Sequence, residues 1–186
     1  MLIIRKATPK DAEAVASYLL LAMEDIVYKF IGEKQSEKAK EFMLYFAKKE
    51  NNQYSYQNCW VALHEGEVVC AVNVYDGARL EGLREDVKAY IKEKFGKEFN
   101  PENESEAGEW YIDTLGVDER FQGRGIGSEV LRFLIDKYVH KEGQTLGLLV
   151  DDDNPKAKKL YLKLGFKSVG KKTLVGKNME HLQIKI

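Results

Sequence analysis

Apolar residues recur along this chain with two different periods, and each period predicts one kind of element. Alternation of apolar with polar or small residues predicts strands, whereas apolar residues three to four positions apart predict helices. The expected strands cover residues 2–6, 59–64, 67–75, 111–117, 145–150, 166–169 and 179–186. The expected helices cover residues 8–27, 33–49, 80–95 and 126–138, and another helix follows Asn154. This order of elements indicates a mixed α/β fold.

The stretch from Tyr111 to Tyr138 combines an apolar strand, a glycine-rich turn and an amphipathic helix. Gly116, inside the strand, indicates either a bulge or a place where a ligand comes close to bare backbone. Gly123, Gly125 and Gly127 stand at the entry of the helix. Glycines there leave backbone N–H groups and the positive end of the helix dipole open to a ligand. The turn therefore predicts a phosphate-binding site.

Two common phosphate-binding loops do not match this turn. A nucleoside-triphosphate loop ends in Gly-Lys-Ser/Thr, whereas Gly127 is followed by Ser128 and Glu129. A dinucleotide loop would need glycine in place of Ser128, and it would open a repeated strand-helix-strand unit instead of lying late in the chain. A nucleoside-triphosphate site is therefore excluded, and a dinucleotide site is only weakly supported.

The motif Q-x-x-G-x-G at residues 122–127 directly follows the strand that ends at Val117. It resembles the pyrophosphate-binding segment of the GNAT superfamily of N-acetyltransferases, which bind acetyl-CoA. Residues 154–166, with Asn154, Ala157, Tyr161 and a closing Gly-Phe, are similar to a later segment of the same family. The resemblance implies a GNAT fold, in which a central, mostly antiparallel sheet flanked by helices splays around acetyl-CoA.

The resemblance also implies which residues hold the cofactor. Backbone N–H groups of the turn would bind the pyrophosphate, and Leu115 and Val117 would pair with the pantetheine. A splay or bulge at Gly116 would free the N–H of Val117 to polarise the thioester carbonyl. Asn154 is implied as a partner of the pantetheine, and it can equally cap the helix that begins at Pro155. The implied cofactor-binding residues are Leu115, Gly116, Val117, Gln122, Gly123, Arg124, Gly125, Ile126, Gly127, Ser128, Asn154 and Tyr161.

Two residues are expected to carry the proton transfers. The resemblance implies Tyr161 as the general acid, and a phenol with a reference pKa of ~10 is protonated at neutral pH; the alternative is that it only packs on the cofactor. Asp113 shares a strand face with Tyr111 and Leu115, and it is the first candidate for the general base, followed by Glu109 and Tyr111. The alternative role of Asp113 is a structural hydrogen bond.

Residues 76–109 lie between the third and the fourth expected strand. GNAT folds commonly connect these two strands by a short turn, so this long insertion departs from the family pattern. Apolar residues at helical spacing predict a helix over residues 80–95 in this insertion. Between Glu98 and Glu109 there are five glutamates and no basic residue. This segment is either a solvated acidic loop or a lid that attracts a cationic amine.

Composition narrows the class of protein. A chain of 186 residues predicts one domain over residues 1–186, and a net charge of -1 argues against a nucleic-acid binder that depends on bulk charge. With no apolar run near ~20 residues and no signal-peptide pattern at the start, we expect a cytoplasmic protein without a membrane partner. Cys59 and Cys70 are expected as unpaired core residues. The three histidines are isolated in the sequence, so no metal site is expected.

The predicted reaction is direct acetyl transfer from acetyl-CoA to a primary amine in a ternary complex, with a small-molecule acceptor. The alternatives are a protein acceptor, at an N-terminus or a lysine, and a non-catalytic acyl-CoA sensor. Residues 156–177 contain eight lysines and no acid, and one or two of them can meet the 3′-phosphate of CoA. A homodimer is a further expectation from the family.

Overall fold

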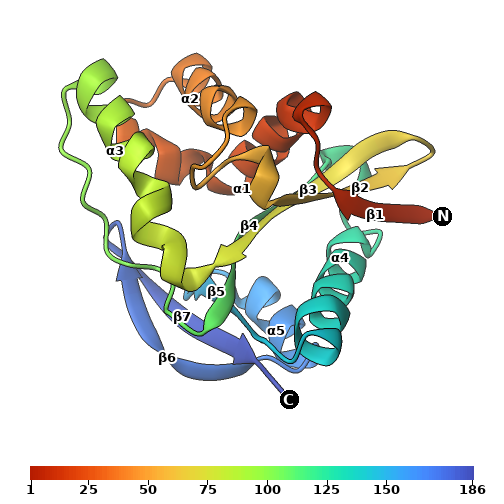
Figure 1. The fold of residues 1–186 in the computed structure, drawn as a ribbon. Coiled ribbons are helices and arrows are strands. Elements are labelled where there is room, and N and C mark those ends of the chain that lie inside the picture. The colour runs from red at the N-terminus through yellow and green to blue at the C-terminus, as the bar shows by residue number, and fades with distance from the viewer.

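The computed structural model describes residues 1–186 and contains one seven-stranded sheet with helices on both faces (Figure 1). Along the sheet the strands follow the order β1-β2-β3-β4-β5-β7-β6. Only the β4–β5 pair is parallel, and all other neighbours are antiparallel. The strands are β1 (Leu2–Lys6), β2 (Cys59–His64), β3 (Glu67–Asp76), β4 (Glu109–Val117), β5 (Thr145–Asp151), β6 (Lys167–Leu174) and β7 (Lys177–Ile184). The predicted mixed α/β class with a mostly antiparallel sheet is confirmed.

Five α-helices cover the two faces of the sheet and form two large apolar cores and a third, small one. They are α1 (Ala12–Ile31), α2 (Ser36–Lys48), α3 (Leu80–Phe95), α4 (Ile126–Leu134) and α5 (Pro155–Lys163). Figure 1 shows α1, α2 and α3 on one face and α4 and α5 on the other. The apolar stripe predicted in the second helix is fully buried at Phe42, Met43 and Phe46. The helix predicted at residues 80–95 is α3, with the same bounds.

The sheet opens between its two parallel strands. Pairing of β4 with β5 covers only Glu109 to Ile112 against Thr145 to Leu148. Beyond Ile112, β4 continues to Val117 paired with β3 alone. From Asp113 to Val117, the edge of β4 that faces β5 has backbone groups that are not paired with another strand. This separation of β4 from β5 is the predicted splay of the sheet.

Of the two roles predicted for Gly116, the bulge is wrong, because the irregular pairing lies earlier in β4. Asn73 of β3 faces Thr114 and Val74 faces Ile112, so Asp113 is the extra residue. At Gly116 the backbone of α1 comes close instead, since a Cβ there would lie 1.8 Å from the carbonyl oxygen of Tyr18. Glycine is needed at this position for a contact within the protein.

Four elements differ clearly from the sequence expectations: the first helix, the last two strands and the helix from Ile126. The first helix extends to Ile31 and bends at Met23, whose backbone φ of -134 is not helical. The last two strands run from Lys167 to Leu174 and from Lys177 to Ile184, joined by a turn at Val175 and Gly176. Val175 has a positive φ of 48, a conformation that β-branched residues rarely adopt, and this conceals the turn in the sequence. The helix from Ile126 changes to a π-helix at residues 135–141.

Cys59 and Cys70 are buried and unpaired, as predicted. No helix of this protein has both the length and the apolar character that crossing a membrane requires.

We predict that Gly116→Ala destabilises the protein, because the added methyl group would force α1 away from β4. The expected loss is about 1–3 kcal/mol of unfolding free energy. Gly82→Ala is the matched control, since Gly82 lies in α3 with nothing within 4 Å of a Cβ, and we expect it to stabilise by about 0.5–1 kcal/mol. Denaturant unfolding of both variants measures the difference. Equal stability of the two variants would show that the contact between α1 and β4 is not tight.

Candidate active site

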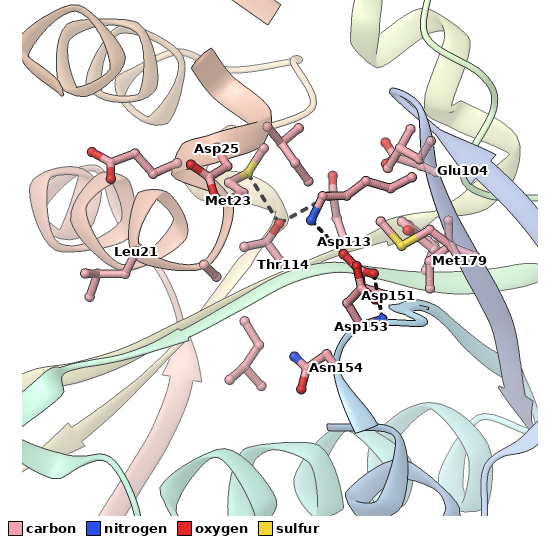
Figure 2. A pocket seen from close by; sticks show the side chains of 18 of the residues that line it. Leu21, Met23, Asp25, Glu104, Asp113, Thr114, Asp151, Asp153, Asn154 and Met179 are labelled. Atoms are coloured by element: carbon pink, nitrogen blue, oxygen red, sulfur yellow. Dashed lines mark hydrogen bonds and ion pairs between the residues drawn. The ribbon is translucent and has the colours of Figure 1, made fainter. Parts of the chain in front are cut away.

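A cavity of about 610 Å³ opens where β4 and β5 separate. Its walls come from the bent part of α1, from β4 and β5, from the start of α5 and from the β6–β7 hairpin (Figure 2). Six carboxylates line it: Glu24, Asp25, Glu104, Asp113, Asp151 and Asp153. Lys177 is the one basic lining residue, and its Nζ lies 2.6 Å from Asp151 Oδ2. The negative charge of the walls favours a cationic ligand.

The structure brings only part of the predicted site to this cavity. Asp113, Leu115, Asn154 and Tyr161 line it. Gly127 lies beside the same strand, because a Cβ there would be 3.6 Å from Leu115 Cδ2. The other predicted cofactor residues, Gly116, Val117, Gln122, Gly123, Arg124, Gly125, Ile126 and Ser128, are not in its lining.

The glycine turn lies beyond the end of β4 and leads directly into α4. Gly123 and Gly125 have φ values of 75 and 85, which favour glycine, and no atom lies within 4 Å of a Cβ built at either. Gln122 Nε2 donates to Val117 O at 3.0 Å and so ties the turn to the strand. The first N–H groups of a helix have no partner within it. The turn is therefore open, and its backbone N–H groups can bind an anion.

Tyr161 and Asn154 come from α5 and the residue that precedes it. Tyr161 is half-buried, packs against the Phe166 ring at a centroid distance of 5.9 Å, and has its pKa raised by burial. Its phenol is therefore protonated at neutral pH. Asn154 Oδ1 accepts a hydrogen bond from Ala157 N at 3.1 Å, which confirms its role as a helix cap.

Asp113 is held at the bulge of β4 by hydrogen bonds. Its Oδ2 accepts from Gln53 Nε2 at 2.9 Å and from Tyr75 OH at 3.0 Å, and Thr114 Oγ1 lies 3.3 Å from its Oδ1. Burial raises the pKa of Asp113 above its usual value, although these donors and Arg84 oppose the shift. Asp113 thus makes the structural hydrogen bonds expected of it while it lines the cavity.

The other two candidates for the base are less suited to the role. Burial raises the pKa of Tyr111 well above its usual value, so this lining residue stays protonated. Glu109 lies outside the cavity lining, where it meets His181 Nε2 at 2.8 Å and Gln183 Nε2 at 2.7 Å. His181 is therefore not isolated, which corrects the sequence expectation. The two residues are 72 positions apart, and nothing local indicates the pair.

The acidic segment after α3 is not a wholly solvated loop. Glu104 is only 5% exposed and Glu109 only 3%. Glu104 Oε1 accepts from Arg84 Nη2 at 2.8 Å and from Gln53 Nε2 at 2.7 Å, and it lines the cavity. Burial, followed by the nearby charge of Asp113, raises the pKa of Glu104 to about 8.

Sequence reasoning missed Gln53 and Arg84, and it placed Glu104 in the acidic segment without its burial or its partner. A signal existed for Arg84, which follows Leu83 and precedes Val87 on the apolar stripe of α3. A cation on such a stripe requires a buried acid as its partner. Gln53 carried no comparable signal.

The acidic segment and the β6–β7 hairpin each contribute to the cavity lining, through Glu104 and through Leu174, Lys177 and Met179, and they are joined to each other. Val175 N donates to Glu102 Oε2 at 3.0 Å, and Lys172 Nζ lies 2.8 Å from Glu106 Oε1. Lys29 of α1 donates to Val175 O at 3.1 Å. Three separate parts of the chain therefore meet at the hairpin turn beside the cavity.

Known proteins match this chain in sequence and in fold. Residues 23–166 match the model of the acetyltransferase (GNAT) family. The N-alpha-acetyltransferase RimI of Mycobacterium tuberculosis is 44% identical over 62 residues, which are 33% of this chain and 37% of that protein. The match to this curated relative thus spans little more than a third of its length.

Two solved structures match over the full length. A crystal structure of an acetyltransferase is 33% identical, covers 99% of both chains and gives a TM-score of 0.81. An N-acetyltransferase from Staphylococcus aureus Mu50, at 22% identity, covers 98% of this chain and 100% of its own, with a TM-score of 0.83, and shows the same fold. From the family match and the first of these structures, the chain belongs to the acetyltransferase (GNAT) family, as its two motifs predicted.

Proposed function

We propose that this protein transfers the acetyl group of acetyl-CoA to a small, positively charged primary amine in a ternary complex. The observation that carries the proposal is the cavity at the β4–β5 opening, where Asp113 and Tyr161 lie among six carboxylates. Family membership supports the acetyl donor. The negative lining supports the positive charge of the acceptor.

The donor would be held by the open turn and by the free edge of β4. Backbone N–H groups of residues 122–128 would bind its pyrophosphate, and Leu115 and Val117 would pair with its pantetheine through main-chain groups. When bound, acetyl-CoA supplies an acetyl group on a thioester whose sulfur can leave as a thiolate. A Val117 N–H directed at the carbonyl oxygen would stabilise the charge that develops there.

Two side chains would move the protons. Tyr161 keeps its proton at neutral pH because burial raises its pKa, so it can donate to the departing sulfur. Asp113, on β4 where the sheet opens, would take the proton that the acceptor ammonium must lose before it attacks. The presence of both residues at one cavity is the reason to prefer an enzyme to a non-catalytic acyl-CoA sensor.

A protein N-terminus is the second candidate acceptor, because RimI is an N-alpha-acetyltransferase. Against it stands the packing beside the cavity, where the hydrogen bond of Val175 to Glu102 and the ion pair of Lys172 with Glu106 join the acidic segment to the β6–β7 hairpin. A peptide requires an open groove, whereas a small amine does not. The single domain, the cytoplasmic location and the homodimer stay predictions.

We predict that Tyr161→Phe lowers the turnover of 1,4-diaminobutane by about 10²-fold or more, because the leaving sulfur loses its proton donor. Thiol release from acetyl-CoA measures the rate. Calorimetric binding of acetyl-CoA is the control, and we expect it to be unchanged because the phenol ring is kept. Full turnover in this variant would reduce Tyr161 to a packing role.

We predict that the double variant Asp25→Asn, Asp153→Asn raises the KM for 1,4-diaminobutane about three- to tenfold, because two carboxylates of the lining are neutralised. The increase should shrink as salt is added, since both side chains are exposed.

Asp152→Asn is the matched control, because Asp152 is adjacent to Asp153 in the chain and is absent from the cavity lining. Its KM should equal that of the unmodified protein. An equal KM in all three proteins would place the acceptor elsewhere.

A further inference from the structure

Two carboxylates in the cavity are joined by one amide group. Gln53 Nε2 lies 2.7 Å from Glu104 Oε1 and 2.9 Å from Asp113 Oδ2, so each of its two hydrogens serves one acid. Arg84 Nε, 3.4 Å from Gln53 Oε1, sets the direction of this amide. Glu104 comes from the segment after α3 and Asp113 from the bulge of β4, so two distant segments supply the pair.

The charges around the pair do not balance when both acids are ionised. Arg84 is the cation in contact, with Nη2 2.8 Å from Glu104 Oε1. The phenols that face the pair, Tyr54, Tyr75 and Tyr111, are neutral because burial raises their pKa values well above the usual range. Glu24 and Asp25 of α1, also in the cavity lining, add further negative charge.

A proton shared by the two acids removes this imbalance. With one proton, Glu104, Asp113 and Arg84 sum to zero charge, whereas full ionisation leaves a net negative charge in a buried place, which is costly. Burial raises the pKa of both acids, that of Glu104 to about 8. Because the two groups interact, this proton belongs to the pair and not to one residue.

We propose that Glu104 is a positioning residue for acetyl transfer, which acts through Asp113: the two carboxyls hold one proton in the free protein and exchange it for the acceptor ammonium. This inference rests on the proposed function. The ammonium becomes the counterion of the doubly ionised pair, so the site is neutral again. Glu104 thereby gives Asp113 a higher proton affinity than an aspartate would have beside Arg84 without a second acid.

The protons balance over one cycle. Asp113 takes one proton from the bound ammonium, and the resulting amine nitrogen forms its bond to the acetyl carbon as the carbon–sulfur bond breaks. Tyr161 gives its proton to the sulfur and regains one from the nitrogen, which is positively charged after its attack and becomes the neutral amide by losing that proton. The pair releases its proton to solvent when the next ammonium binds.

We predict that Glu104→Gln moves the rising limb of the kcat/KM profile for 1,4-diaminobutane to lower pH by at least about one unit. In the unmodified protein this limb reflects loss of the shared proton, so kcat/KM rises as pH approaches about 8. In the variant, Asp113 stands beside Arg84 without a second acid, and its pKa falls. The KM should rise about tenfold, because the ammonium then adds an unbalanced positive charge.

Two further variants separate this role from a merely structural one. Arg84→Gln removes the cation, so the limb should move in the opposite direction, to higher pH. Glu98→Gln, on the exposed part of the same segment, should leave the profile unchanged. The proposal would be overturned if the rising limb of the kcat/KM profile lay at the same pH in the unmodified protein and the three variants. It would also be overturned if the limb moved in the same direction in Glu104→Gln and Arg84→Gln.

A titration without substrate tests the shared proton separately from the enzyme activity. Carboxyl ¹³C NMR of the free protein should show a transition of the pair near pH 8, and this transition should disappear in Glu104→Gln. If every carboxyl of the unmodified protein titrates below about pH 5, the proposal is wrong even if the protein acetylates amines. If the transition near pH 8 is present but no amine is acetylated, the shared proton stands and the proposed function fails. The titration of the unmodified protein decides this point even if the variant is unstable.

Discussion

The early end of pairing between β4 and β5 is the constraint on which the rest of the structure depends. After Ile112 the free edge of β4 carries N–H and C=O groups without a strand partner, and such groups require hydrogen bonds. The backbone of α1 rests against Gly116 on the same part of the strand. The opening is therefore built into the packing of the sheet, and it leaves room for both a ligand that continues the sheet and the cavity beside it.

The segment between β3 and β4 contributes more than a connection. Through Glu102 and Glu106 it holds the β6–β7 hairpin beside the cavity, and through Glu104 it adds a buried acid. A buried ion pair such as Arg84 with Glu104 is weak evidence for stability, because desolvation offsets much of the attraction. The Arg84–Glu104 ion pair instead affects the chemistry of the site, because it lies next to Asp113 and sets how tightly Asp113 holds a proton.

Sequence periodicity predicted the strands and helices well because each element buries one face, and α3 was found with its expected bounds. The family motifs predicted the glycine turn and Tyr161, since both are local in sequence. The bulge at Asp113 was not predictable, because register depends on the partner strand. The partners of Glu104 and His181 were missed for a related reason: Arg84 and Glu109 lie 20 and 72 residues away from them. The turn at Val175 was not predictable, because β-branched residues such as valine rarely adopt the positive φ that this turn requires.

The acceptor class is tested most directly by one comparison of rates. The measurement is kcat/KM for thiol release from acetyl-CoA, with 1,4-diaminobutane and with a short peptide whose only amine is its N-terminus. Because six carboxylates line the cavity, we expect the diamine value to exceed the peptide value by at least about tenfold at low salt. A peptide value equal to or above that of the diamine would contradict a small cationic acceptor and would favour a protein N-terminus.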